Sequence, residues 1–394
     1  MCCHIYIRQL YGYVAKVILA FWKYNVKRGS SLKSIKNELL QFLEQETREI
    51  KVVVMPDFFL DRIIDLECDA ISFASIIADI VSRKGGSIDG VAQTDLRGGN
   101  AINTASALAN LGINVTPIIC TSRLGLQQLR FSLKAQNIDL SHVKTIENAS
   151  LTTALELKSE SGKANVMLRD LGSLADFGPA SLIDDDYELI AESDYVCLFN
   201  WAGTRKHGTE LAKKVFQKMK TRGKGKTYFD TADPNPNRER IPELIDNVLK
   251  TELVDVLSLN ENEAVTYASF ISGGSEINRS GTNFNEFPLE SARLLAKRLD
   301  VRIDLHARTF SGTFTKKIET VVPALKLKAL RATGAGDAWN AGNILADGNR
   351  LSDECRLALA NTVSACYLTD PTGEHPTKRK LVSFLKSHQF ISGI

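Results

Sequence analysis

The sequence has few of the features that mark extracellular, metal-binding or nucleic-acid-binding proteins. Its seven cysteines are scattered and odd in number; Cys2 and Cys3 are adjacent, and none of the others forms a C-x-x-C pair. A disulfide framework and a cysteine-based metal site are therefore not expected, and a reducing cytoplasm is the expected location. The net charge of +3 is too small to indicate a nucleic-acid partner.

A long hydrophobic run is also missing near the N-terminus. Residues 10–22 are apolar but are interrupted by Lys16, so they are too short to span a bilayer. No small-residue cleavage site of a signal peptide is obvious. We expect either an amphipathic helix that docks on the body or a partner, or an extension upstream of the true start. With a helical pattern at 31–49, the sequence predicts an N-terminal helical extension at 1–49, followed by one large domain at 50–390.

The rest of the chain alternates short apolar runs with helical patterns. Hydrophobic residues make up 44% of the sequence and charged residues 24%, as in soluble globular proteins. The runs end in polar residues and lie at 51–55, 195–199, 227–229, 254–259 and 301–305. Strands that alternate with helices predict a mostly parallel α/β sheet covered on both faces, with ligands beyond the carboxyl ends of the strands. The polar residues there are site candidates, although some of them only cap the following helix.

One Gly-rich turn carries the clearest chemical signal. Residues 332–336 open directly into a helical pattern that ends at Gly348, and the free backbone N–H groups of a helix start favour a phosphate. Asp337 is the single charged residue of this turn. A carboxylate repels an anion, so its presence suggests a general base for a hydroxyl that attacks a phosphate. The alternative is an ordinary helix start with an acid in its first turn.

A second Gly-rich segment, residues 98–112, also leads into a helix. Asn100 is a plausible N-cap residue, and Gly112 ends the helical pattern. The pair of segments, more than 200 residues apart, resembles the two signatures of the PfkB carbohydrate kinase family, G-G-x-x-x-N-x-A and T-G-A-G-D. The resemblance covers roughly residues 50–390. It implies a ribokinase-like three-layer α/β/α fold with a mostly parallel central sheet and a small β lid, whose segments lie near 86–97 and 150–170.

The resemblance also implies roles for individual residues. Asp337 would be the catalytic base, and the backbone of Gly334, Ala335 and Gly336 would stabilise the transferring phosphate. The implied substrate-binding residues are Asp57, Asp61, Gly98, Gly99, Asn103 and Arg169. The implied nucleotide-binding residues are Asn260, His306, Thr333, Asn361 and Gly373, and Glu263 would hold Mg²⁺ through water. Plainer interpretations stay open, including a loop acid at Asp57 or Asp61, a helix-surface residue at Asn103 and a surface arginine at Arg169.

Four of the positions that depart from the family pattern lie near the Gly-rich turn at 332–336 or at the end of the last predicted strand. Arg331 and Ala332 stand where the family usually has Asp-Thr, and Trp339 replaces the usual Phe. His306 stands where a Thr-x-Gly sequence usually supplies part of the nucleotide site. These changes leave ATP and ADP both open as the donor, and the loss of the acid at Arg331 could alter a monovalent-cation site.

The sequence therefore predicts a cytoplasmic enzyme that moves the terminal phosphate of a nucleotide to a hydroxyl of a sugar or sugar-like acceptor, with Mg²⁺. Three alternatives remain: a nucleoside kinase of the same fold, an ADP-dependent sugar or ribose-phosphate kinase, and an inactive ligand-binding regulator on a kinase scaffold. Small-molecule acceptors and nucleotides are the expected partners. A membrane span is not expected, and a homodimer is an open expectation because exposed lid strands often pair between subunits.

Overall fold

An eight-stranded sheet lies at the centre of the computed structural model, which describes residues 32–134, 136, 138–159, 162–222, 224–273, 287–331 and 333–388. The strand order is β14-β13-β12-β11-β10-β9-β1-β4. Neighbouring strands from β4 to β12 are parallel, and only β13 and β14 run antiparallel to their neighbours. The mostly parallel sheet predicted from the sequence is confirmed. Its strands are β1 (Lys51–Met55), β4 (Asn114–Pro117), β9 (Tyr195–Phe199), β10 (Lys226–Asp230), β11 (Val256–Asn260), β12 (Arg302–His306), β13 (Phe310–Phe314) and β14 (Glu319–Pro323).

Helices cover both faces of this sheet and bury two separate hydrophobic cores. In β1, Val52 and Val54 belong to one core while Val53 and Met55 belong to the other, because successive side chains of a strand point to opposite faces. The first core is closed by α2 (Leu32–Glu44), α4 (Asn100–Asn110), α11 (Ala335–Gly348), α12 (Asp353–Leu368) and α13 (Lys378–Ser387). The second is closed by α6 (Asp184–Glu192), α7 (Gly208–Arg222), α8 (Ile241–Leu244), α9 (Glu261–Ile271) and α10 (Phe287–Arg298).

Short elements connect these layers. They are α5 (Arg123–Ser132), the two-stranded sheet of β5 (Cys120–Thr121) and β6 (Lys144–Thr145), and the single-turn segments η1 (Gly172–Asp176), η2 (Pro179–Ser181), η3 (Trp201–Gly203), η4 (Asn235–Arg240) and η5 (Ile245–Leu249). No helix among the described residues combines the length and the apolar character needed to cross a membrane.

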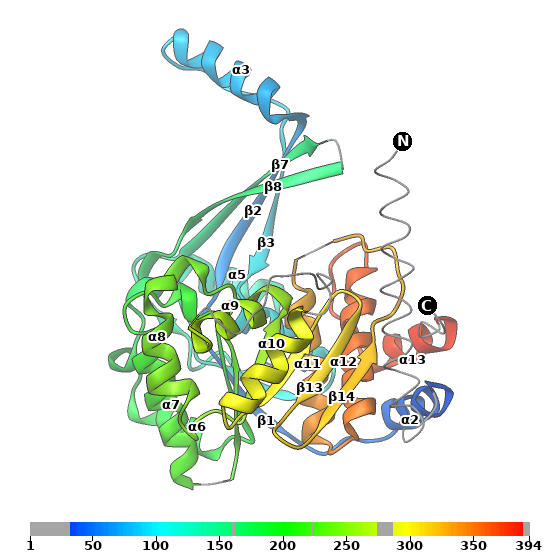
Figure 1. Ribbon diagram of the computed structural model, residues 1–394. Coiled ribbons are helices and arrows are strands. Elements are labelled where there is room, and N and C mark those ends of the chain that lie inside the picture. Colours follow the sequence, from blue (N-terminus) through cyan, green and yellow to red (C-terminus); the bar gives the residue numbers. More distant parts are fainter. Residues whose placement is uncertain are drawn as a thin grey trace.

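A second sheet, the lid sheet, projects from one end of the body (Figure 1). Its strand order is β3-β2-β7-β8, formed by β2 (Phe59–Asp69), β3 (Ala92–Gly98), β7 (Ser150–Ser159) and β8 (Gly162–Asp170). Helix α3 (Ala70–Ser82) lies at its far end. The sequence analysis anticipated neither β2 nor α3. Most of β2 is only half-buried, so it lacks the regular alternation of buried and exposed residues that marks a strand.

Helix α2 belongs to the main body rather than to a separate extension. Ile35, Leu39 and Leu43 are buried in the first core. Lys36 Nζ donates to the backbone oxygen of His388 at 3.0 Å, which ties α2 to the end of α13. The predicted docking helix at 10–22 lies outside the described residues.

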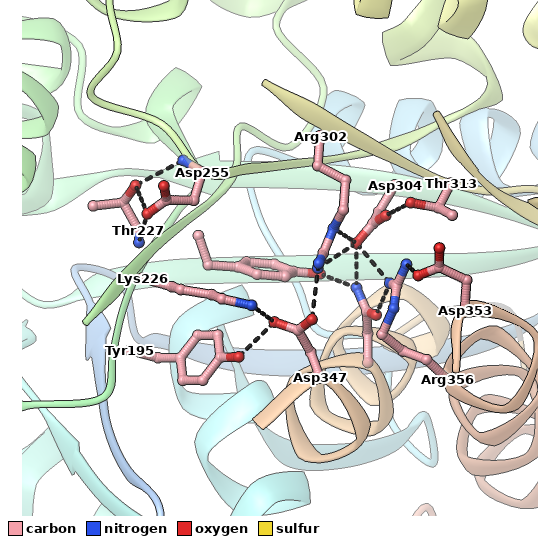
Figure 2. A network of polar contacts seen from close by, with 12 residues as sticks. Tyr195, Lys226, Thr227, Asp255, Arg302, Asp304, Thr313, Asp347, Asp353 and Arg356 are labelled. Atoms are coloured by element: carbon pink, nitrogen blue, oxygen red, sulfur yellow. Dashed lines mark hydrogen bonds and ion pairs between the residues drawn. The ribbon is translucent and has the colours of Figure 1, made fainter. Parts of the chain in front are cut away.

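A buried polar network anchors the C-terminal half of α11 to the sheet (Figure 2). Asp347 Oδ1 accepts from Arg302 Nη1 at 2.8 Å, and Asp347 Oδ2 accepts from Lys226 Nζ at 2.8 Å and Tyr195 Oη at 2.5 Å. The Arg302 and Lys226 cations hold the pKa of Asp347 far below its usual range, against the effect of burial. The Asp347 carboxylate thus links α11 to β9, β10 and β12.

A second carboxylate, Asp304 on β12, extends the network towards α12. Arg356 Nη1 donates to Asp304 Oδ2 at 2.9 Å and to Asn343 Oδ1 at 2.5 Å, and Asn343 Nδ2 donates to Asp304 Oδ2 at 2.9 Å. Arg356 and Asp304 are both almost fully buried. Helices usually pack on sheets through apolar side chains; α11 does so too, and directional polar contacts fix its position in addition.

Candidate active site

Asp337 lies in the first turn of α11, at the base of the lid sheet, and is 4% exposed. Two side-chain amides of α4 hold its carboxylate: Asn100 Nδ2 donates to Oδ1 at 2.9 Å and Asn103 Nδ2 donates to Oδ2 at 3.1 Å. The two Gly-rich segments recognised in the sequence therefore meet at one carboxylate.

The environment of Asp337 suits a general base. Burial raises the pKa of Asp337 to about 8; the Asn100 and Asn103 hydrogen bonds lower it, and the charges of Asp230 and Asp57 raise it further. A carboxyl group that titrates near neutral pH can accept a proton from a hydroxyl and later release it.

The turn before Asp337 favours glycine at Gly334 and leaves little space for a side chain at Gly336. Gly334 is the N-cap residue of α11 with φ +80°, a conformation that favours glycine. A Cβ on Gly334 would lie 2.5 Å from the Tyr367 hydroxyl oxygen, and one on Gly336 would lie 3.3 Å from His306 Cε1. Because the first N–H groups of a helix have no partner within it, this turn can bind an anion through its backbone.

The carboxylate of Asp57 is occupied by hydrogen bonds within the protein interior. It is fully buried, and it accepts from the backbone N–H groups of Asn100 at 3.0 Å and Ala101 at 2.8 Å and from Asn200 Nδ2 at 2.9 Å. These contacts hold the N-terminus of α4. The structure thereby gives Asp57 a role in shaping the first Gly-rich turn rather than a free carboxylate to offer a substrate.

The same turn shows why Asn100 is not the N-cap residue that the sequence predicts. The N-cap position is occupied by Gly99 with φ +100°, and a Cβ there would lie 2.8 Å from the backbone oxygen of Asp57. With the helix start capped by Asp57, the side chain of Asn100 is available for Asp337.

Asp61 on β2 lies beside Gly98, the residue directly before this turn. A Cβ on Gly98 would overlap its carboxyl group, and no described residue satisfies its buried Oδ1. Burial raises the pKa of Asp61, whereas a hydrogen bond from Thr152 and the charge of Arg169 lower it. Arg169 on β8 lies on the same face of the lid sheet, with its guanidinium 5.0 Å from the centre of the Phe59 ring.

Asn260 and Glu263 form a capping box at the start of α9. Asn260 Oδ1 accepts from the backbone N–H of Glu263 at 3.0 Å, and Glu263 Oε2 accepts from the backbone N–H of Asn260 at 2.9 Å. Burial raises the pKa of Glu263 well above its usual value, and the neighbouring acids Asp230 and Asp233 raise it further. A nearby cation would stabilise the charged forms of these clustered acids.

The donor set agrees with a water-mediated magnesium site. Among the described residues, no three His, Cys, Asp or Glu side chains are grouped so that they could hold a metal ion directly. Mg²⁺ commonly keeps several of its waters and takes only one or two protein carboxylates. Glu263 with Asp230 nearby fits that mode.

His306 ends β12 beside the Asp337 turn. Its ring centre lies 5.1 Å from that of Trp339, and its Nε2 is buried with no hydrogen-bond partner in the described part of the chain. Burial lowers the pKa of His306, so the ring is neutral at physiological pH. A buried nitrogen without a partner beside the Gly334–Gly336 turn is a candidate contact to a ligand.

The side chain of Asn361, predicted to bind the nucleotide, is hydrogen-bonded within the protein interior instead. Its Oδ1 accepts from Trp339 Nε1 at 2.9 Å and Ser311 Oγ at 2.5 Å, and its Nδ2 donates to the Pro323 backbone oxygen at 3.2 Å. With 5% of its surface exposed, the side chain has no free polar atom for a nucleotide. The same contacts accommodate Trp339 in the interior, because its indole N–H donates to Asn361.

The other two nucleotide candidates border the turn. Thr333 is exposed immediately before Gly334. Gly373, with φ +77°, lies in the loop after α12, where an added Cβ would overlap the guanidinium of Arg331. The loop of Gly373 therefore packs on Arg331, which lies two residues before Thr333 in the chain.

The structure adds site residues that the sequence analysis did not select. Asn100 was predicted only as a cap, and Asn200 and Asp230 are the polar residues directly after the apolar runs 195–199 and 227–229. Asp230 Oδ2 accepts from Asn340 Nδ2 at 2.7 Å, and its charge acts on Asp337, Glu263 and His306. The sequence feature that could have identified Asp230 is its position at the end of a buried strand.

Comparison with solved structures gives relatives of similar architecture. A nucleoside kinase from Methanocaldococcus jannaschii has 18% identity and a TM-score of 0.60, with 87% of this chain and 100% of that chain covered. Arabidopsis thaliana ribokinase complexed with ribose and ATP has 17% identity and a TM-score of 0.63, covering 86% and 99%. A putative ribokinase II from E. coli in complex with ATP and Mg²⁺ has 14% identity and a TM-score of 0.64, also covering 86% and 99%.

These likenesses confirm the ribokinase-like fold. No curated protein matches the sequence. A family comparison matches residues 69–272, just over half of the chain, to the pfkB family carbohydrate kinases. That range contains the first Gly-rich segment and the Asn260–Glu263 capping box, while the second Gly-rich segment lies beyond it. The chain belongs to the pfkB carbohydrate kinase family.

Proposed function

We propose that this protein transfers the terminal phosphate of a nucleotide to a hydroxyl group of a sugar or sugar-like acceptor. The observation that carries the proposal is the arrangement around Asp337: a buried carboxyl group held by two amides of α4, at the start of a helix whose free N–H groups adjoin it. A base and an anion site side by side are what phosphoryl transfer to a hydroxyl requires.

The reaction is assigned as follows. Asp337 accepts the proton of the acceptor hydroxyl as its oxygen attacks the terminal phosphorus. The bond between that phosphorus and the bridging oxygen of the nucleotide breaks, and the shortened nucleotide leaves. The backbone N–H groups from Gly334 to Gly336 stabilise the charge on the phosphoryl oxygens. No covalent enzyme intermediate is needed, because positioning and electrostatics supply the catalysis.

Magnesium, when bound, would neutralise the phosphates of the nucleotide. Glu263 would hold it through water, and Asp230 is the second carboxylate near that position. His306 and Thr333 would contact the phosphates beside the turn. Two of the similar structures hold bound ATP, and one of them also holds Mg²⁺, which favours ATP as the first donor to test.

The lid sheet would cover the acceptor. Asp61 would accept hydrogen bonds from acceptor hydroxyls, and Arg169 lies beside it on the same face of the lid sheet. Closure of the lid excludes water, which would otherwise receive the phosphate. A nucleoside acceptor is the second candidate, because a nucleoside kinase shares this architecture along its whole length.

A coupled assay with ATP or ADP as donor tests the proposal on a panel of sugars, sugar phosphates and nucleosides. Turnover of a sugar supports the proposal, and turnover of only nucleosides supports the second candidate. Asp337→Asn should lower kcat by about 10²–10⁴-fold, the usual contribution of a general base. If the wild-type protein binds nucleotide but turns over no acceptor, the inactive-regulator alternative is correct.

A further inference from the structure

Arg331 connects the segment before the Asp337 turn to the loop that follows α12, residues 369–374. Its Nη2 donates to the backbone oxygen of Asp370 at 2.7 Å. The loop passes so close to the guanidinium that a Cβ on Gly373 would overlap Nη1. The hydrogen bond has a charged donor and is therefore stronger than a neutral one.

The same guanidinium lies over an aromatic ring. Arg331 Cζ is 5.4 Å from the centre of the Tyr367 ring, and the ring of His375 stacks on Tyr367 with centres 4.7 Å apart and planes 16° from parallel. Tyr367 is 9% exposed. A cation over an aromatic face is attracted to it, and the attraction grows as water is excluded. Tyr367 is thus fixed by contacts with two neighbouring side chains.

Tyr367 in turn limits where Gly334 can lie. The Tyr367 hydroxyl oxygen would be 2.5 Å from a Cβ at Gly334, so the phenol edge packs directly against the glycine. Gly334 has φ +80°. Glycine has little conformational preference of its own, so the direction of the N–H groups that follow it depends on such neighbours.

We propose that Arg331 is a positioning residue for phosphoryl transfer: through Tyr367 it holds the turn at Gly334 in the geometry that binds the transferring group. The inference rests on the proposed function. An arginine suits this task because its planar guanidinium can stack on a ring and donate in its own plane at once, and because it stays charged at every relevant pH. A lysine ammonium offers a point charge without that geometry.

Kinetics of Arg331→Ala and Arg331→Lys test the inference. We expect kcat to fall about 10- to 100-fold in both, the usual effect of a small misplacement of catalytic groups. The KM for nucleotide should change less than about threefold, and the melting temperature should change little. Millimolar guanidinium chloride should restore part of kcat in Arg331→Ala only, since the lysine side chain of Arg331→Lys fills the space.

Two further variants separate this role from a general effect of charge or packing. Lys328→Ala removes an exposed cation from the same segment and should leave kcat unchanged. Tyr367→Leu should lower kcat as Arg331→Ala does, and the double variant should be no worse than either single one.

The inference is overturned if Arg331→Ala keeps its kcat, if guanidinium restores nothing, or if Lys328→Ala shows the same loss. It is also overturned if the effects of Arg331→Ala and Tyr367→Leu add up independently. A wild-type protein that transfers phosphate from neither ATP nor ADP contradicts the proposed function itself, and the inference then fails with it.

Discussion

The side-chain amide of Asn103 on α4 donates to Oδ2 of Asp337 on α11 at 3.1 Å. This hydrogen bond stabilises the charged form of a carboxylate that burial otherwise destabilises. It couples the position of the first Gly-rich segment to the proton affinity of the proposed base.

The pH dependence of kcat/KM should follow the titration of Asp337. Its pKa is raised to about 8, so the base form increases with pH: kcat/KM should rise about tenfold per unit below pH 8 and level off above it. Asn103→Ala removes a contact that lowers the pKa, and should move the midpoint to higher pH. A profile of initial rates from pH 5.5 to 9.5 measures both. An unchanged midpoint in Asn103→Ala contradicts the assignment of this pair.

The two acids near the first strand should respond differently to substitution. Asp57→Ala leaves two backbone N–H groups of α4 without their acceptor, which should lower the free energy of unfolding by about 1–3 kcal/mol. Asp61→Asn should leave stability nearly unchanged, because burial already disfavours the charged form, but should raise the acceptor KM at least about tenfold. Thermal melts and steady-state kinetics on both variants test this difference. A stable Asp57→Ala with a raised acceptor KM, together with a destabilised Asp61→Asn, would show that the two roles are exchanged.

Arg356 should be far more important to stability than an exposed cation. It is 1% exposed and donates to Asp304, Asn343 and Asp353. Arg356→Met leaves the buried Asp304 partly unpaired and should cost about 3–5 kcal/mol in urea unfolding. Lys250→Met removes an exposed ion pair with Asp246 and should cost at most about 1 kcal/mol. Equal costs would show that the network in Figure 2 does not anchor α11.

Helix α3 should lie in a homodimer contact. Its side chains include Ile71, 84% exposed, and Val81, 67% exposed, while Asp79 is its single charged residue and pairs with Arg83. A helix that is apolar on most sides needs cover, and a second copy of α3 offers a surface that is equally apolar. Light scattering should give a dimer for the wild-type protein and a monomer for Ile71→Asp with Val81→Asp. A monomeric wild-type protein at micromolar concentration would contradict this contact.

The sequence was most informative where a local pattern has one physical explanation. Five of the strands of the central sheet and the helices after both Gly-rich turns were predicted within a few residues, because apolar runs and glycine turns are local properties. The same patterns do not reveal β2, which has no regular alternation of apolar and polar residues, or α3, whose apolar residues are not confined to one face. The sequence analysis also assigned Asp57 and Asn361 to ligands, although their partners, Ala101 and Trp339, become neighbours only in the folded chain.

The sequence by itself determined the kind of fold and the two turns that meet at the site, because glycine placement and apolar periodicity act over a few residues. Only the tertiary structure decided which polar side chains remain free. Asp57, Asn260 and Asn361 are used by caps and buried contacts, whereas Asp61 and His306 each keep a buried atom that has no partner among the described residues. A carboxylate or amide has the same chemistry in either place, and whether it serves the fold or a ligand depends on which donors the folded chain brings to it.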